Sequence, residues 1–181
     1  MAEAPLVEVN EGVNSSGGLL VSCFPSVGLV SSIVAHFLVE KLELDLVGGV
    51  RHPNLPPVCL VHDGKPLPPL RFYAGEPICN MEQCDKVVLI ASEIQIPPEL
   101  NLPLSNSLID WLVDSGGSST IMVDSFAHGI ESSHSIFDDE EGMDSMLGIG
   151  STDSTHELLK QIGVPLLKQG LVSGMTGVMM G

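Results

Sequence analysis

Hydrophobic positions along the chain change their period several times, and each period predicts a different element. Residues Gly18 to Phe24 are a continuous apolar run between glycine and proline, which predicts a buried strand. From Val27 to Leu42 the apolar residues recur with a helical period, and Ser26 is placed to cap the N-terminus of that helix. The residues near one face of this predicted helix are Val27, Val30, Val34, Phe37, Leu38 and Lys41.

Later segments repeat this alternation of strands and helices. Apolar runs predict strands at Leu44 to Val50, Lys86 to Ala91, Thr120 to Asp124, Met146 to Ile149 and Pro165 to Val172. Helical patterns cover Leu104 to Val113, which Gly116 and Gly117 end, and the stretches THELLKQIG and SGMTGVMMG.

One hairpin interrupts the alternation. Val58 to Val61 reads as a short strand, Asp63 and Gly64 form a turn signal, and Leu70 to Tyr73 is predicted as the returning strand. Prolines on both sides cannot donate to a ladder, so these strands are expected at a sheet edge.

The order of elements predicts an α/β fold. The expected architecture is a three-layer sandwich on a mostly parallel central sheet with an inserted β-hairpin. The 181 residues suit one domain, 1–181, and no linker or repeat divides them. An acidic segment around Asp138 to Glu141 is predicted as a solvated loop.

The charge of the chain argues against two classes of binding partner. The formal net charge is −16, from 23 acidic and 7 basic residues. Nucleic acid and anionic membranes need clustered Lys and Arg, so neither is expected as a partner. No apolar run is long enough to span a membrane, and no secretory signal precedes the four cysteines, Cys23, Cys59, Cys79 and Cys84. A reduced, cytoplasmic chain is expected.

Serine-rich turns follow the predicted strands. In an open parallel sheet, ligands bind outside the carboxyl ends of the strands, so these turns mark the edge where a site is expected. The candidate ligand-binding residues there are Ser26, Gly28, Glu93, Ser125, His128 and Asp153. Polar loops and helix-capping serines explain most of this pattern without a ligand.

The sequence motifs for a serine nucleophile, a phosphate site and a zinc site are incomplete or absent. Around Ser26 the pentad Phe24-Pro25-Ser26-Val27-Gly28 lacks the first glycine of a nucleophile elbow, so Ser26 is interpreted as a helix cap. Gly28 is expected to allow close packing of the helix on the sheet. Neither phosphate-binding glycine motif is present, although a helix N-terminus retains free donors for weak anion binding. The spacing Cys79-x4-Cys84 does not suit zinc, and no metal or cofactor is expected.

With these motifs in order, the chain resembles the proteasome assembly chaperone family, in particular its archaeal, second-chaperone-like branch. CFPSVGLVSSIVAHFLVEKL is similar to the family opening G-F-P-x-x-G-L-V-G. NLPPVCLVHDGKPLPPLRFYAGE, KVVLIASEIQIPPEL, LIDWLVDSGG and SGMTGVMMG extend the resemblance over nearly the whole chain. It implies an α/β fold similar to purine nucleoside phosphorylases, self-association into homo-oligomers, and proteasome α subunits as partners. Because relatives continue through a further C-terminal helical segment, the resemblance implies a short member of the family or a truncated chain.

Two functions therefore stand side by side. The leading hypothesis is a binding protein that acts through its surface without covalent chemistry, with Leu67, Leu70, Phe72 and Tyr73 as candidate contacts or core residues. The alternative is an enzyme or small-ligand binder with a nucleoside- or phosphate-type site at the strand ends. Its anion would need cations, and the only arginines are Arg51, after a strand, and Arg71, inside one. That shortage favours the binding protein.

Overall fold

The structure is a computed structural model that describes residues 5–10, 13, 16–76, 86–126 and 146–181. It divides into two compact units, which are described separately. Unit 1 comprises 1–127, 173–179 and 181, and unit 2 comprises 128–172 and 180. Whether both belong to one domain, as the length predicts, stays a prediction. In the described part of the chain, no helix is long and apolar enough to cross a membrane.

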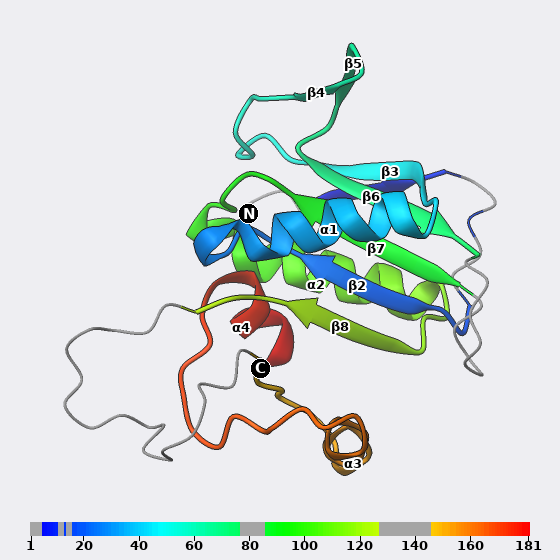
Figure 1. The fold of residues 1–181 in the computed structure, drawn as a ribbon. Helices are drawn as coiled ribbons and strands as arrows, with labels where there is room; N and C mark the ends of the chain where they lie inside the picture. The colour runs from blue at the N-terminus through cyan, green and yellow to red at the C-terminus, as the bar shows by residue number, and fades with distance from the viewer. Residues whose placement is uncertain (1–4, 11–12, 14–15, 77–85, 127–145) are drawn as a thin grey trace. The chain divides into compact units, whose positions relative to one another are not determined.

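A six-stranded mixed sheet forms the centre of unit 1 (Figure 1). Its strands, in spatial order, are β1 (Leu6–Val9), β3 (Asp45–Arg51), β6 (Leu70–Gly75), β7 (Val87–Ser92), β2 (Leu19–Cys23) and β8 (Ser119–Val123). The two parallel pairings are those of β2 with β7 and of β2 with β8, and the other three pairings are antiparallel. The prediction of a mostly parallel sheet is therefore wrong, whereas the α/β class is confirmed.

Helices cover both faces of this sheet, with α1 (Val30–Lys41) in front and α2 (Pro98–Asp114) behind in Figure 1. Because side chains alternate along a strand, β7 serves two cores. Val87, Leu89 and Ala91 pack on the α1 side, and Val88 and Ile90 on the α2 side. Burial on both faces explains why the strand reads as an unbroken apolar run.

On the α2 side, large side chains fill the core. Leu100, Leu104 and Leu108 recur every four residues along α2 and are almost fully buried against the sheet. Met175, from α4 (Gly174–Met180), completes this cluster. The helix predicted at Leu104 to Val113 is thus confirmed but begins six residues earlier, with prolines at its start.

The hairpin differs from its prediction. β4 (Leu60–His62) pairs with β5 (Lys65–Leu67) around Asp63 and Gly64, whose φ angles are +49° and +73°. β6 is not the returning strand; it lies inside the main sheet between β3 and β7. The prolines that suggested an edge stand between β5 and β6 instead of within β6.

The predicted first helix is broken at its start. A 3₁₀ turn, η1 (Val27–Leu29), precedes α1, and Gly28 and Leu29 both adopt left-handed φ angles, +68° and +60°. The predicted face of the helix is correct only in part. Val34 and Leu38 pack against the core, whereas Val27, Val30 and Phe37 are exposed. The fully buried residues are Ser31 and Ala35, because small side chains let a helix lie close to a sheet.

Unit 2 contains α3 (Asp153–Gln161), which confirms the helix predicted in THELLKQIG. The Thr152 hydroxyl accepts a hydrogen bond from the Thr155 N–H, at 3.2 Å, and caps it. The strands predicted at Met146 to Ile149 and Pro165 to Val172 are absent from this described segment. A single bridge between Gly148 and Leu166 stands in their place.

Candidate functional site at the strand ends

Strand directions bring several segments to one edge of the sheet in unit 1. β2, β7 and β8 run parallel, and β3 runs in the same direction because β6 opposes both β3 and β7. Their carboxyl ends therefore share an edge. Since the β4–β5 hairpin joins the end of β3 to the start of β6, it rises from that same edge (Figure 1).

A buried ion pair is the strongest polar feature there. Arg71, on β6, has no exposed side-chain surface, and it forms a two-pronged salt bridge with Glu93, which follows β7. Nη1 donates to Glu93 Oε2 at 2.7 Å, and Nη2 donates to Oε1. Nε donates to the Tyr73 hydroxyl at 2.9 Å, and Nη1 also donates to the Pro68 carbonyl at 3.1 Å. The guanidinium nitrogens Nε, Nη1 and Nη2 therefore all donate hydrogen bonds to other groups of the protein.

Electrostatics keep this arginine charged. Burial alone would lower the pKa of Arg71, but hydrogen bonds and charge from Glu93, with a smaller part from Tyr73, raise the pKa above its usual range. The carboxylate neutralises the cation, so Arg71 offers no free charge to a phosphate. His36 of α1 adds Nε2 at 3.3 Å from Glu93 Oε1, which makes Glu93 the centre of the network.

Serine hydroxyls tie the next two strand ends together. Ser26 Oγ lies 2.5 Å from Ser31 Oγ and accepts a hydrogen bond from the Ser31 N–H at 3.3 Å. Ser31 Oγ donates to the Val123 carbonyl at 2.9 Å, and Ser125 Oγ donates to the Val27 carbonyl. Leu29, not Ser26, is therefore the N-cap residue of α1, because the 3₁₀ turn intervenes; Ser26 precedes that turn and reaches α1 only through its hydrogen bond with Ser31. Its hydroxyl is structural.

Three predicted ligand residues are treated separately, because the structure gives one of them another role, places one in unit 2 and does not describe the third. A Cβ added to Gly28 would meet nothing within 4 Å, so Gly28 is required for its positive φ and not for close packing. Asp153 begins α3 in unit 2 and follows no strand of the sheet, so the strand-end argument does not apply to it. His128 lies outside the described residues.

The four predicted partner-binding residues fall into two groups by burial. Leu70 and Phe72 have no exposed surface and belong to the α2-side core, so they are core residues and not surface contacts. Leu67 and Tyr73 are half-buried. Alternation along β6 puts Phe72 on one face and Tyr73, which holds Arg71, on the other.

Nucleophile and metal chemistry find no support in the described residues. Burial raises the pKa of the Cys23 thiol to about 11, so it is protonated near neutral pH and a poor nucleophile. Among these residues, no three His, Cys, Asp or Glu side chains gather as metal ligands. Cys79 and Cys84 lie outside them. Arg51, the other arginine, is paired with Glu8 at 2.8 Å.

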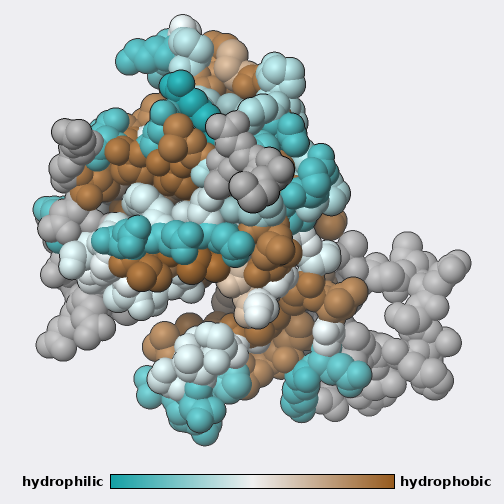
Figure 2. Space-filling model, turned by 180° about the vertical axis from the view of Figure 1, so that it is seen from behind, coloured by the Kyte–Doolittle hydropathy of each residue, from teal (hydrophilic) through white to brown (hydrophobic). Residues whose placement is uncertain are grey.

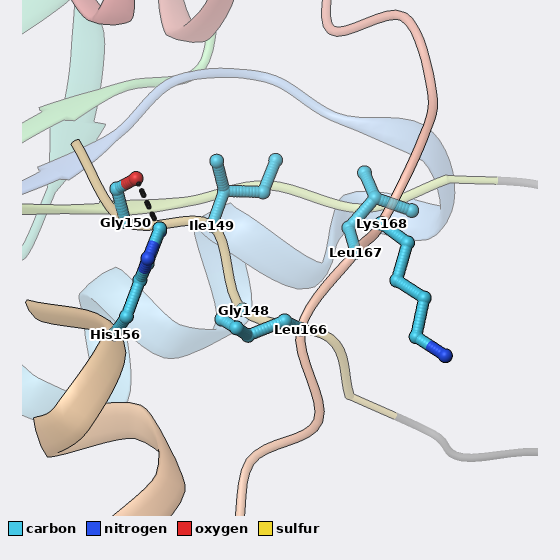
Figure 3. Close-up of a pocket in the computed structure, with 7 residues that line it drawn as sticks. All are labelled: Gly148, Ile149, Gly150, His156, Leu166, Leu167 and Lys168. Atoms are coloured by element: carbon cyan, nitrogen blue, oxygen red, sulfur yellow. Dashed lines mark hydrogen bonds between the residues drawn. The ribbon is translucent and has the colours of Figure 1, made fainter. Parts of the chain in front are cut away.

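Unit 2 has a hollow of about 360 Å³ (Figure 3). Its lining residues are Gly148, Ile149, Gly150, His156, Leu166, Leu167 and Lys168. The His156 ring is held by the Gly150 carbonyl at 2.9 Å, and the Lys168 ammonium points away from the other lining residues. Without convergent polar groups, this hollow has no means of orienting a ligand.

Sequence reasoning missed an exposed apolar strip on unit 1. We call it the α1 strip, and its residues, with their exposed fractions, are Val27 (56%), Leu29 (64%), Val30 (41%), Ile33 (64%) and Phe37 (61%). Hydrophobic surface also reaches solvent on the reverse side of the molecule (Figure 2). On α2, Leu102 (60%), Ile109 (40%) and Val113 (69%) are exposed; Ile109 and Val113 are one turn apart, and Leu102 lies two turns before Ile109. In the α1 strip, Val30, Ile33 and Phe37 follow one another at single-turn spacing.

The fold and these surfaces define a mixed α/β protein whose strand-end polar groups are bonded to one another. Comparison with protein families matches residues 20–181 to the PAC2 family. The chain belongs to the PAC2 family. A comparison with curated proteins gave no match.

Solved structures of archaeal proteins are similar to this chain. PbaA of Pyrococcus furiosus, an archaeal homolog of proteasome-assembly chaperone, is 27% identical with a TM-score of 0.79. The match covers 98% of this chain and 66% of PbaA, so this chain spans just under two thirds of that protein. PbaB of the same organism, an archaeal proteasome activator, shares the fold at 14% identity and a TM-score of 0.74, over 97% of this chain and 73% of PbaB.

Proposed function

We propose that this protein is a proteasome-assembly-chaperone-like factor that acts by binding proteasome α subunits, without covalent chemistry. The observation that carries this proposal is that the polar side chains at the strand-end edge of the sheet form hydrogen bonds with other groups of the protein. Arg71, Glu93, Ser26 and Ser125 use their polar atoms within the protein, as a scaffold does and an anion site does not. The similarity to PbaA over almost the whole chain supports the choice of partner.

The same proposal extends to the detailed type of fold, the oligomeric state, the cellular location and one contact residue. Helices on both faces of the sheet support a three-layer sandwich of the purine nucleoside phosphorylase type. We also propose self-association into homo-oligomers and a cytoplasmic location, where proteasome α subunits are made. The half-buried Leu67, at the end of β5 in the hairpin, remains a candidate contact.

Native mass spectrometry tests the proposal directly. The protein is mixed with unassembled α subunits of its own organism's proteasome and, separately, with finished particles. We expect a complex of defined stoichiometry with the free subunits only, because a chaperone masks a surface that ring assembly later buries. Absence of any complex with free α subunits would contradict the function.

A further inference from the structure

We infer that the α1 strip is the surface that binds the partner, and that the matching surface has an apolar centre ringed by Lys and Arg. This inference rests on the proposed function and deepens it, because it names the binding face and the chemistry of the partner.

Spacing makes the strip one surface. At about 100° per residue, Val30, Ile33 and Phe37 lie within about 60° of one another around α1, and each is one turn from the next. His36, which contacts Glu93 at the end of β7, flanks the strip about 60° beyond Ile33. At the helix start, the Ser125 hydrogen bond to Val27 joins η1 to the end of β8. The side chains of the strip leave between 41% and 64% of their surface exposed.

Leu29 adds a second argument. A left-handed φ costs a leucine about 1–2 kcal/mol relative to glycine, and its side chain is 64% exposed. Burial therefore does not compensate the backbone cost within unit 1. A strained, exposed leucine is explained if it contacts a partner.

Charge identifies the kind of partner. Exposed carboxylates border the strip: Glu40 on the same helix face, Glu43 and Asp45 just after the helix, and Asp124 beside η1. Lys41, one turn beyond Phe37 on the same face, is the only Lys or Arg on α1, and the four carboxylates outnumber it. A second copy of this chain, with net charge −16, would set acidic rims against each other. A basic rim around an apolar centre would be complementary.

The test compares two matched double variants in the full chain. Ile33→Glu with Phe37→Glu changes the strip, and Leu102→Glu with Val113→Glu makes the same change at exposed positions of α2 on the other face. Binding to unassembled α subunits of the same organism is measured by biolayer interferometry. We expect at least about tenfold weaker binding for the strip variant and less than about threefold change for the control.

The rim is tested by charge reversal. Glu40→Lys should weaken binding several-fold, and Asp114→Lys, at the end of α2, should not. Raising NaCl from 50 to 500 mM, chosen for about a threefold shorter Debye length, should weaken the wild-type complex. Binding that is insensitive to both would overturn the basic rim.

Other outcomes separate the two hypotheses. If wild type binds and the strip variant binds equally well, the strip is wrong and the proposed function stands. If wild type binds no α subunit, the proposed function fails and the inference falls with it. Light scattering would reveal a second copy as the occupant if the strip variant alone loses subunits. A lower Tm of the strip variant alone would show that the chain itself covers the strip, and either result overturns the inference.

Discussion

The two helices that cover the sheet bury residues of different size. α2 buries a row of leucines in the larger core and leaves Leu102, Ile109 and Val113 exposed. α1 buries Ser31 and Ala35, packs Val34 and Leu38 against the smaller core, and leaves Val30, Ile33 and Phe37 exposed. Beneath α1 the sheet carries the buried Arg71–Glu93 pair. The difference shows that apolar content does not by itself measure burial. The leucines of α2 fill the larger core, whereas the two fully buried residues of α1 are small.

The largest expected effect comes from breaking the ion pair on the α1 side. Glu93→Ala would leave the buried Arg71 guanidinium without its counter-charge, so we expect a loss of about 3–5 kcal/mol in the free energy of unfolding. Urea unfolding measures it. Replacing both partners, Arg71→Met with Glu93→Leu, should recover most of the loss, because no unpaired charge remains. A double variant as unstable as Glu93→Ala would contradict this explanation.

The next test sets the two helices against each other. Leu104→Ala should lower the free energy of unfolding by about 2–5 kcal/mol, since it opens a cavity in the α2-side core. Ile33→Ala, the same kind of truncation on α1, should change it by no more than about 0.5 kcal/mol. Equal losses in chemical denaturation would mean that the α1 strip is covered in the native state.

How far the sequence predicts this molecule depends on whether a segment's partners are local. β2, β7 and β8 were predicted nearly to the residue. For β2 and β7 the reason is that burial on both faces makes a strand continuously apolar; β8, at the sheet edge, was found from its β-branched and apolar residues although it is half-exposed. β1 was missed, since four half-exposed residues give little pattern and depend on pairing with β3, about 40 residues away. The buried face of α1 was predicted only in part: Val34 and Leu38 pack against the core. Apolar residues surround that helix, so periodicity could not select Ser31 and Ala35, the small pair that is most buried.

The candidate site shows the same limit. Local sequence predicted Ser26 as the N-cap of the helix, but the 3₁₀ turn moves the N-cap of α1 to Leu29, and the Ser26 hydroxyl accepts from the Ser31 N–H instead. The Arg71–Glu93 pair could not be predicted, because it depends on the register of β6 against β7, which sets Arg71 opposite Ala91. An arginine inside an otherwise apolar strand was the only signal. It indicates a buried counter-charge but does not say where along the chain that charge lies.

The smallest effect in stability is the sharpest test of what the α1 strip is for. Leu29→Gly removes a side chain that burial does not favour and relieves a left-handed backbone, so the free energy of unfolding should rise by up to about 1 kcal/mol. Gly28→Ala adds a Cβ to the same conformation one residue earlier and should lower it by about 1 kcal/mol. Differential scanning calorimetry compares the two. A stabilised Leu29→Gly that binds α subunits more weakly would mean that the leucine serves binding at the expense of the fold; an unchanged affinity would remove Leu29 from the strip.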